Sequence, residues 1–161
     1  MIKIHLLTHQ RESERPTNTG QLAIELFPQQ VTRIIWNRVN QDKTLQKLAS
    51  NKQLALIHPS GKPLEANKGI ANSGPPFHQY VLLDATWQEA QKILNRTPYL
   101  KQLEVFSINT KTSSDYLLRR NQRADGLCTA ECVIELFKTH GEIKNAEILL
   151  DHFHSFNQRS R

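Results

Sequence analysis

The hydrophobic pattern of the chain predicts five strands that alternate with five helices. Short runs of mostly apolar residues bounded by Pro, Gly or polar residues are typical of strands, and apolar residues three or four positions apart are typical of helices. The predicted strands are residues 2–8, 31–36, 53–58, 80–84 and 104–108. The predicted helices are residues 21–27, 42–49, 86–95, 128–140 and 143–156, with Asp42 as the cap of the second.

This alternation is typical of an α/β domain with one mostly parallel sheet and helices on both of its faces. No internal repeat and no linker divides the chain, so residues 1–161 are expected to form a single domain. Three polar loops, residues 8–20, 58–79 and 109–127, each follow a predicted strand. Because parallel strands end at the same edge of a sheet, we expect these loops to meet at one edge.

The segment Asp84-Ala85-Thr86-Trp87 stands where the fourth strand ends and the next helix begins. In open α/β sheets, ligands bind at that end of the strands. Asp84 can act there as a general base or can cap the helix, and Thr86 is the better candidate for the cap. Trp87 can stack on a base or an adenine ring, or it can pack in the core.

Two of the polar loops carry clustered cations. In the first loop, Arg11 and Arg15 can clamp a phosphate or a carboxylate, although the same residues also suit an ordinary solvated loop. In the third loop, three arginines and a tyrosine within eight residues suit contacts with a nucleic-acid backbone, although they also suit an ordinary basic surface. The residues of this cluster in the third loop are Tyr116, Arg119, Arg120 and Arg123.

Composition and charge narrow the class of protein. The chain has 161 residues, of which 38% are hydrophobic and 22% charged, as in a soluble globular domain with a proper core. No apolar run approaches the ~20 residues of a membrane span, and the first residues alternate like a strand rather than a signal peptide. We therefore expect a cytoplasmic protein with free thiols at Cys128 and Cys132. The net charge of +6 favours a polyanionic partner, with nucleic acid as the first candidate.

Several common sites are missing from the sequence. The chain has neither a Gly-x-Gly-x-x-Gly fingerprint nor a Walker-type Gly-Lys-Ser/Thr loop. A nucleotide-like cofactor is therefore expected to bind through another backbone arrangement. Two cysteines without a second pair, together with scattered histidines, predict no metal site.

The residues after the fourth strand resemble a known family. Asp84-Ala85-Thr86-Trp87, followed by Gln88, Ala90 and Lys92, is similar to the Asp-x-Thr-Trp motif of DTW-domain proteins. Three further blocks resemble the same family in the same order, so the resemblance covers nearly the whole chain. These blocks are His9-Gln10-Arg11-Glu12 with Arg15-Pro16-Thr17-Asn18-Thr19-Gly20, then His58-Pro59, then Ser114-x-Tyr116-x-x-Arg119 with Gly126-Leu127-Cys128-Thr129-Ala130-Glu131.

The resemblance implies a tRNA-uridine aminocarboxypropyltransferase that uses S-adenosylmethionine as co-substrate. Such enzymes transfer the 3-amino-3-carboxypropyl group to N3 of a uridine and release methylthioadenosine. The resemblance also implies a SPOUT-like, Rossmann-type domain with a C-terminal knot, and knots are rare among folds. Many relatives carry cysteines near the N-terminus that look like a zinc site, and this chain has none there. That difference leaves the choice of RNA substrate open.

The resemblance also implies roles for individual residues. Asp84 is the expected proton acceptor for uridine N3, and Arg11 or Arg119 is expected to hold the carboxylate of the cofactor. The expected cofactor-binding residues are Thr8, Arg11, Leu56, His58, Pro59, Thr86, Trp87, Arg119, Leu127 and Thr129. The expected tRNA-binding residues are Arg15, Asn18, Tyr116, Arg120 and Arg123.

Two other functions remain open at this point: a SPOUT-type RNA methyltransferase and a non-catalytic RNA-binding module. The sequence has no clear interface stripe, so a monomer and a homodimer are both compatible with it.

Overall fold

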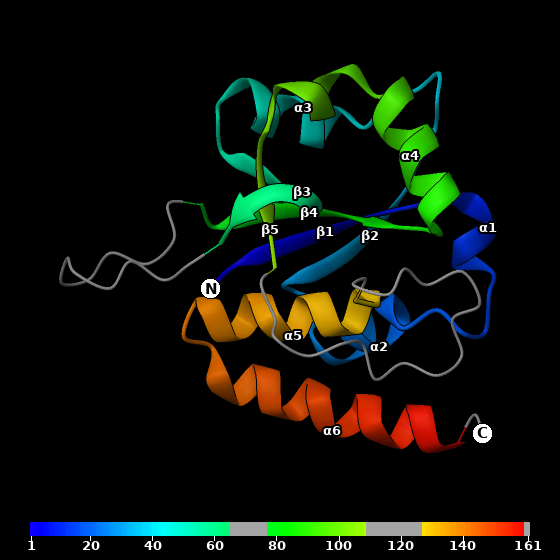
Figure 1. Ribbon diagram of the computed structural model, residues 1–161, viewed down its shortest axis with the longest axis vertical. Helices are drawn as coiled ribbons and strands as arrows, with labels where there is room; N and C mark the ends of the chain where they lie inside the picture. Colours follow the sequence, from blue (N-terminus) through cyan, green and yellow to red (C-terminus); the bar gives the residue numbers. More distant parts are fainter. Residues whose placement is uncertain (65–76, 109–126, 160–161) are drawn as a thin grey trace, which may run out of the picture.

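Five parallel strands form one sheet at the centre of the computed structural model, which describes residues 1–64, 77–108 and 127–159 (Figure 1). The strands are β1 (Lys3–Thr8), β2 (Val31–Ile35), β3 (Leu54–Pro63), β4 (Gln79–Asp84) and β5 (Glu104–Ser107). Their order across the sheet is β2-β1-β4-β3-β5, and every neighbouring pair is parallel. The prediction of an α/β domain with a mostly parallel sheet is therefore confirmed.

Helices cover both faces of the sheet (Figure 1). One face carries α3 (Lys43–Ser50), α4 (Trp87–Arg96) and the short 3-10 helix η1 (Pro98–Gln102). The other face carries α2 (Gly20–Leu26) and α5 (Thr129–Thr139), with α6 (Ile143–Arg159) outside them as a further layer. The single-turn helix α1 (Gln10–Ser13) lies beside the carboxyl ends of the central strands. None of the helices in these described ranges has both the length and the apolar character of a membrane span.

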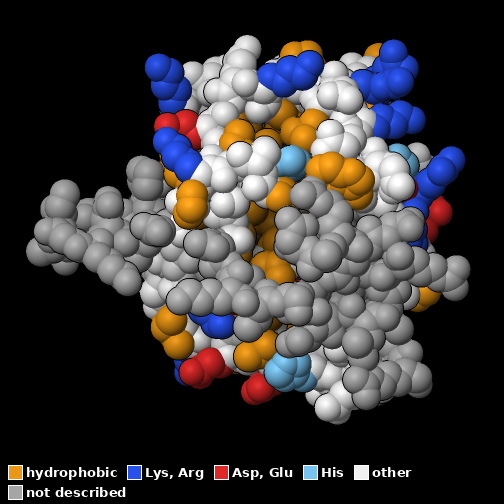
Figure 2. Space-filling model, viewed as in Figure 1, with side chains coloured by type: hydrophobic (Ala, Val, Ile, Leu, Met, Phe, Trp, Pro, Cys, Tyr) orange, Lys and Arg blue, Asp and Glu red, His pale blue; other side chains and the backbone are white. Residues whose placement is uncertain are grey.

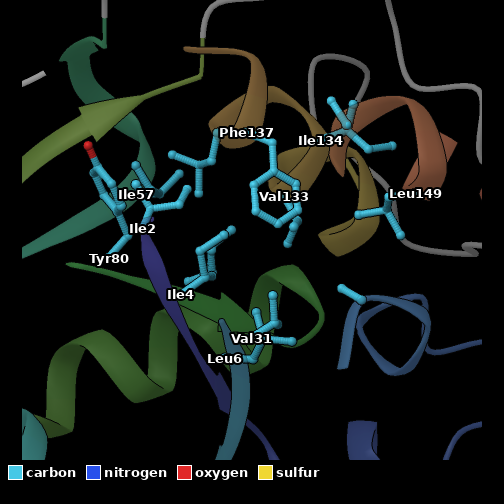
Figure 3. Packing of buried hydrophobic residues seen from close by; sticks show 14 of the residues in the cluster. Ile2, Ile4, Leu6, Val31, Ile57, Tyr80, Val133, Ile134, Phe137 and Leu149 are labelled. Carbon is cyan, nitrogen blue, oxygen red and sulfur yellow. The ribbon is translucent and has the colours of Figure 1, made fainter. Parts of the chain in front are cut away.

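Alternation along the strands divides the core into two buried clusters. Ile4 and Leu6 of β1 face α2, α5 and α6, whereas Leu7 of the same strand faces the side covered by α3, α4 and η1. In the larger of the two clusters, which faces α2, α5 and α6, strand residues pack against Val133 and Phe137 of α5 (Figure 3). Because successive strand side chains point to opposite faces, this pattern is the reason that both faces need helices.

Side-chain caps fix where two of the helices begin. The Asp42 carboxylate accepts a hydrogen bond from the Leu45 backbone N–H (2.9 Å) at the start of α3. At the start of α4, the Thr86 hydroxyl accepts from the Glu89 N–H (3.3 Å), and the Glu89 carboxylate accepts from the Thr86 N–H (2.9 Å). This reciprocal pair is a capping box. Both predicted caps, Asp42 and Thr86, are confirmed.

The predicted strand 53–58 was too short, because β3 runs past Pro59 to Pro63. Pairing with β4 ends at Ile57, and the register with β5 shifts between Ile57 and Lys62. Pro59 lies in this irregular stretch, where no neighbouring strand requires a backbone N–H from it. At Gly61 an added Cβ would lie 2.6 Å from the backbone of β5, so only glycine allows this approach.

Other differences from the predicted elements are small. The single turn α1 and the 3-10 helix η1 were missed, because neither is long enough to display a helical period. The remaining boundaries agree within a few residues. The predicted knot depends on the path of residues 109–126, which lie outside the described residues, so it stays a prediction.

The connections after β1 and β4 leave the sheet in opposite directions. The chain passes from β1 through α2 on one face to β2, and from β4 through α4 on the other face to β5. Since β1 and β4 are neighbours, this divergence opens the sheet edge at their carboxyl ends. Such a topological switch point is where open α/β folds bind ligands.

At the opposite end of β4, Tyr80 and His140 form a partly buried polar contact. The Tyr80 hydroxyl donates to the Phe77 carbonyl (3.1 Å) and lies 2.6 Å from Nε2 of His140. Burial, together with the charge of His78, lowers the pKa of His140 from 6.5 to about 4. Burial also raises the pKa of Tyr80. The folded protein therefore holds His140 neutral under conditions in which an exposed histidine would be charged.

We expect the stability of the protein to fall as the pH is lowered from 6.5 toward about 4. Over that range the unfolded chain binds a proton at His140 that the folded chain does not, whereas above it neither state does. Thermal melts across this range should give a steeper decline for the wild type than for His140→Gln. The exposed α6 residue His152 supplies the matched control, His152→Gln, which should leave the slope unchanged. An equal slope in His140→Gln and wild type would contradict the assignment.

Candidate active site

Asp84 is buried at the switch point, with only 1% of its surface exposed. It ends β4, and the register of the sheet places Thr8, the last residue of β1, directly beside it. The Thr8 hydroxyl lies 3.0 Å from Asp84 Oδ2 and 3.1 Å from the Leu6 carbonyl oxygen. A hydroxyl has one proton, and the carboxylate is the stronger acceptor of the two. The sheet itself therefore supplies the first partner of this carboxylate.

Three other segments direct donors at the same carboxylate. The Asn18 side-chain amide donates to Oδ1 (3.0 Å) and Oδ2 (3.1 Å), and the Thr129 hydroxyl donates to Oδ1 (2.8 Å). The Arg33 guanidinium on β2 lies 3.7 Å from Oδ2. Asp84 thus joins two neighbouring strands, the loop before α2 and the first residue of α5. Its charge is offset by donors and one cation, as burial requires.

Asn18 connects this carboxylate to α2. Its side-chain oxygen accepts from the Gln21 backbone N–H (3.1 Å) at the start of α2 and from Arg33 Nη2 (2.6 Å). Gly20 lies against the same groups, and a Cβ there would be 3.2 Å from Asp84 Oδ2 and 3.1 Å from Asn18 Oδ1. The close approach of α2 to Asp84 explains why the helix begins with glycine.

The start of α5 is held by both the carboxylate and the loop after β1. Thr129 reaches Asp84, and the next residue, Ala130, donates its backbone N–H to the Thr19 hydroxyl (3.0 Å). Burial raises the pKa of the neighbouring Cys128 thiol, so this thiol is neutral. Both cysteines are thiols rather than a disulfide. Thr8 and Asn18 of the first predicted loop therefore meet Thr129, which stands two residues after the third predicted loop, at Asp84.

A partly exposed aromatic pair lies where β3 stops pairing with β4. The rings of His58 on β3 and Trp87 on α4 are stacked, with centroids 6.0 Å apart and an interplanar angle of 29°. Neither residue is fully buried. Trp87 follows Thr86 at the start of α4, so the Asp-x-Thr-Trp segment presents a carboxylate, a helix cap and an aromatic ring within four residues. An aromatic face beside a strand end suits a flat heterocyclic ligand.

Arg15 fastens the first loop to α4. Its guanidinium donates to both Glu89 carboxylate oxygens (3.1 and 3.0 Å) and to Glu12. The hydrogen bond to Glu89 raises the pKa of Arg15 against the effect of burial. Burial alone would raise the pKa of Glu89, but Arg15 and the Thr86 N–H lower it overall. Glu89 thus completes the capping box and anchors the loop that carries Asn18.

The remaining predicted cofactor residues lie in different surroundings. Arg11 is exposed on α1, and Pro59 is exposed in the irregular part of β3. Leu127 is partly buried just before α5. Leu56 differs from expectation, because its side chain is only 2% exposed and packs in the core beneath α3 and α4. Its side chain therefore has almost no exposed surface for an adenine ring.

Of the predicted RNA contacts, Arg15 and Asn18 are already engaged within the protein. Arg15 is held by two carboxylates, and Asn18 is only 5% exposed with its amide donated to Asp84. A contact of the buried Asn18 amide with RNA would require its bond to Asp84 to break, whereas Arg15 is one-third exposed and keeps further N–H donors. The predicted site residues Tyr116, Arg119, Arg120 and Arg123 lie outside the described residues.

The sequence interpretation missed Arg33 and Thr19 as partners in this network. Arg33 stands in a strand and Thr19 in a polar loop, and neither position carries a local signal of its contact. Glu89 could have been found, because a Glu three residues after a Thr cap is the pattern of a capping box.

We expect Asp84→Asn to destabilise the fold. An amide cannot accept hydrogen bonds at both terminal atoms, so Asn18 or Thr129 loses its acceptor, at a cost of about 1–3 kcal/mol. Thr129→Val removes a single donor and should cost less, about 0.5–1.5 kcal/mol. Urea unfolding followed by two optical probes measures both losses. The exposed α6 residue Asp151 supplies the control Asp151→Asn, and equal stability of the two Asp→Asn variants would contradict the buried network.

Comparison with curated proteins finds distant relatives of this chain. The chain is 26% identical over 133 residues to tRNA-uridine aminocarboxypropyltransferase 2 of Drosophila melanogaster, a match that covers 80% of this chain and 52% of that protein. It is 20% identical over 132 residues to the protein of the same name from Macaca fascicularis, covering 80% of this chain and 44% of that protein. The chain thus spans about half the length of the curated relatives it matches.

No solved structure gives a significant match. The family model for the DTW domain matches residues 1–161, which include the Asp84–Trp87 segment, the loop that carries Asn18 and the start of α5. The chain therefore belongs to the DTW-domain family.

Proposed function

We propose that this protein is a tRNA-uridine aminocarboxypropyltransferase that uses S-adenosylmethionine and modifies N3 of a uridine. The observation that carries the proposal is the Asp84 carboxylate, held by Thr8, Asn18 and Thr129 at the switch point of a DTW-family sheet. The names of the two relatives support the same activity. Since they are distant and about twice as long, the activity is assigned to this chain as a proposal.

The residues at the sheet edge fit such a co-substrate. The partly exposed His58 and Trp87 rings suit the flat adenine of S-adenosylmethionine. The exposed Arg11 on α1 suits the carboxylate of the same molecule. Thr86 and Leu127 border the same edge, from the start of α4 and the approach to α5. When bound, S-adenosylmethionine supplies an electrophilic 3-amino-3-carboxypropyl group and leaves methylthioadenosine.

Asp84 is the proposed acceptor of the uridine N3 proton. N3 is a poor nucleophile until that proton leaves, and a carboxylate within hydrogen-bond reach can take it. Thr8, Asn18 and Thr129 all donate to Asp84 and together occupy both of its oxygens, so the proton has to replace at least one existing hydrogen bond. Thr129 is the partner most easily displaced, because it is partly exposed whereas Thr8 and Asn18 are buried.

The same geometry offers an alternative in which Asp84 only holds the site together. In that case its removal would loosen the loop before α2 and the start of α5, and another group would take the proton. The two roles differ in their consequences, because Thr8→Val and Thr129→Val weaken the network while the carboxylate remains.

Two other functions are separated by their products. A methyltransferase of the same fold would release S-adenosylhomocysteine instead of methylthioadenosine. A non-catalytic RNA-binding module would release neither and would bind tRNA with a salt-dependent affinity. The Asp84 carboxylate and the His58–Trp87 ring pair beside it favour an enzyme over the binding module, because the switch point of an open α/β sheet is where such folds bind small ligands.

Purified protein incubated with unmodified tRNA and S-adenosylmethionine should produce 3-(3-amino-3-carboxypropyl)uridine and methylthioadenosine in equal amounts. Nucleoside mass spectrometry and chromatography of the adenosine products measure both. Formation of S-adenosylhomocysteine with a methylated nucleoside would assign the protein to the methyltransferases. Absence of any product with tRNA from a strain lacking this protein would contradict the transferase.

In the same assay, Asp84→Asn should lower the rate about 100-fold or more at a temperature where the variant is folded. Thr129→Val should lower the rate far less, because it leaves the carboxylate in place. If both variants lose activity only in proportion to their loss of stability, Asp84 is a positioning residue and not the base. Asp151→Asn on α6 is the control with unchanged activity.

A further inference from the structure

The positive charge of the chain is not evenly distributed over the described structure. Seven exposed Lys and Arg side chains lie on one side of the sheet, on α3, α4, η1 and the connections beside them. Figure 2 shows Lys and Arg side chains along the edge of the molecule where Figure 1 places α3 and α4. The residues of this basic face are Arg38, Lys43, Lys47, Lys52, Lys92, Arg96 and Lys101.

Acidic residues on this basic face are few, and two of the three already form hydrogen bonds with other groups. In residues 36–53 and 87–104 they are Asp42, Glu89 and Glu104. Asp42 caps α3, and Glu89 is bound to Arg15 and the Thr86 N–H. Within the described parts of the chain, no Lys or Arg of the basic face forms an ion pair with a carboxylate.

The opposite side of the molecule has the reverse composition. Residues 20–30 and 127–158, which form α2, α5, α6 and their borders, hold six acidic residues and two lysines. One of the two lysines, Lys138, is paired with Glu135 (3.4 Å). The acidic residues are Glu25, Glu131, Glu135, Glu142, Glu147 and Asp151. A polyanion would therefore be drawn to the basic face and repelled from the α5–α6 side.

The spacing of the cations on α3 and α4 also favours a bound polyanion. Lys43 and Lys47 are four residues apart on α3, and Lys92 and Arg96 are four residues apart on α4. Like charges at this spacing lie side by side and cost an isolated helix about 0.2–0.5 kcal/mol per pair. The described contacts provide no carboxylate that offsets this repulsion. A bound row of phosphates would offset it.

The basic face is continuous with the candidate active site. Helix α4 starts at Trp87, three residues after Asp84, and leads along this side of the sheet to Arg96. At 1.5 Å per residue the helix spans about 14 Å from Trp87 to Arg96. Phosphates held by Lys92 and Arg96 would therefore lie a few nucleotides from a uridine at the sheet edge.

We propose that the basic face formed by α3, α4 and η1 is the surface that binds the sugar-phosphate backbone of the tRNA substrate. The inference rests on the proposed function, since it takes tRNA as the substrate. It assigns RNA binding to helices on the opposite side of the sheet from α5 and α6, outside the loops that the sequence motifs marked. Recognition by this face depends on phosphate charge and carries no base preference of its own.

The test is charge reversal with a matched control. Lys43→Glu/Lys47→Glu and Lys92→Glu/Arg96→Glu alter the basic face, and Lys138→Glu/Lys144→Glu makes the same charge change on α5 and α6. Fluorescence anisotropy with unmodified tRNA, at several salt concentrations, measures affinity. Each basic-face variant should bind about tenfold or more weakly, with a salt slope reduced by roughly 0.9 per lost phosphate contact. The control should change affinity less than about threefold.

Each outcome decides the inference. Equal losses in the control and the basic-face variants would mean that only net charge matters, and unchanged affinity in the basic-face variants would remove the surface. Failure of the wild type to bind tRNA, or tighter binding to vesicles of anionic lipid that the same variants abolish, would also overturn it. A wild type that binds tRNA through this face but forms no aminocarboxypropyl product would overturn the proposed function alone. A wild type that modifies tRNA while the variants bind normally would overturn the surface alone.

Discussion

The arrangement of the site depends on one buried carboxylate. Asp84 ends β4, and its two oxygens receive hydrogen bonds from Thr8, Asn18 and Thr129, with Arg33 nearby. A charge that is 1% exposed is tolerable only if such donors replace the lost water. The requirement is mutual, because the carboxylate in turn helps to fix the loop before α2 and the start of α5 at this edge. One side chain thereby joins segments that are up to 121 positions apart, from Thr8 to Thr129.

A second network holds the rim of the site. Glu89 closes the capping box of α4 and binds Arg15, so the position of the first loop is tied to the helix that carries Trp87. The two networks meet in Asn18, whose amide also reaches Glu12 (3.2 Å). Preorganised polar groups of this kind can favour developing charge without reorganising during a reaction. The proposed transferase activity uses that property, and the basic face beyond α4 would bring the RNA to it.

Much of the fold could be predicted from the chain because its signals are local. Within the described residues, apolar runs and helical periods located every strand and every α-helix longer than one turn, and Asp42 and Thr86 were identified as caps from their position before a helix. The strand β3 was predicted too short, because Pro59 normally ends a strand and only the irregular register against β5 accommodates it. The motif segment Asp84–Trp87 was placed correctly at a strand end, since parallel strands must present their carboxyl ends together.

The sequence by itself determined which residues form strands and helices, the family, and the type of side chain at the strand ends. Only the tertiary structure decided what those side chains do. The burial of Leu56 and Asn18, the pairing of Arg15 with Glu89, and the approach of Arg33 to Asp84 all join residues that no local pattern relates. The segregation of cations to α3 and α4 likewise follows from the side of the sheet to which each connection crosses. Local propensity acts over a few residues, whereas burial and charge pairing depend on strand order, which brings distant segments together.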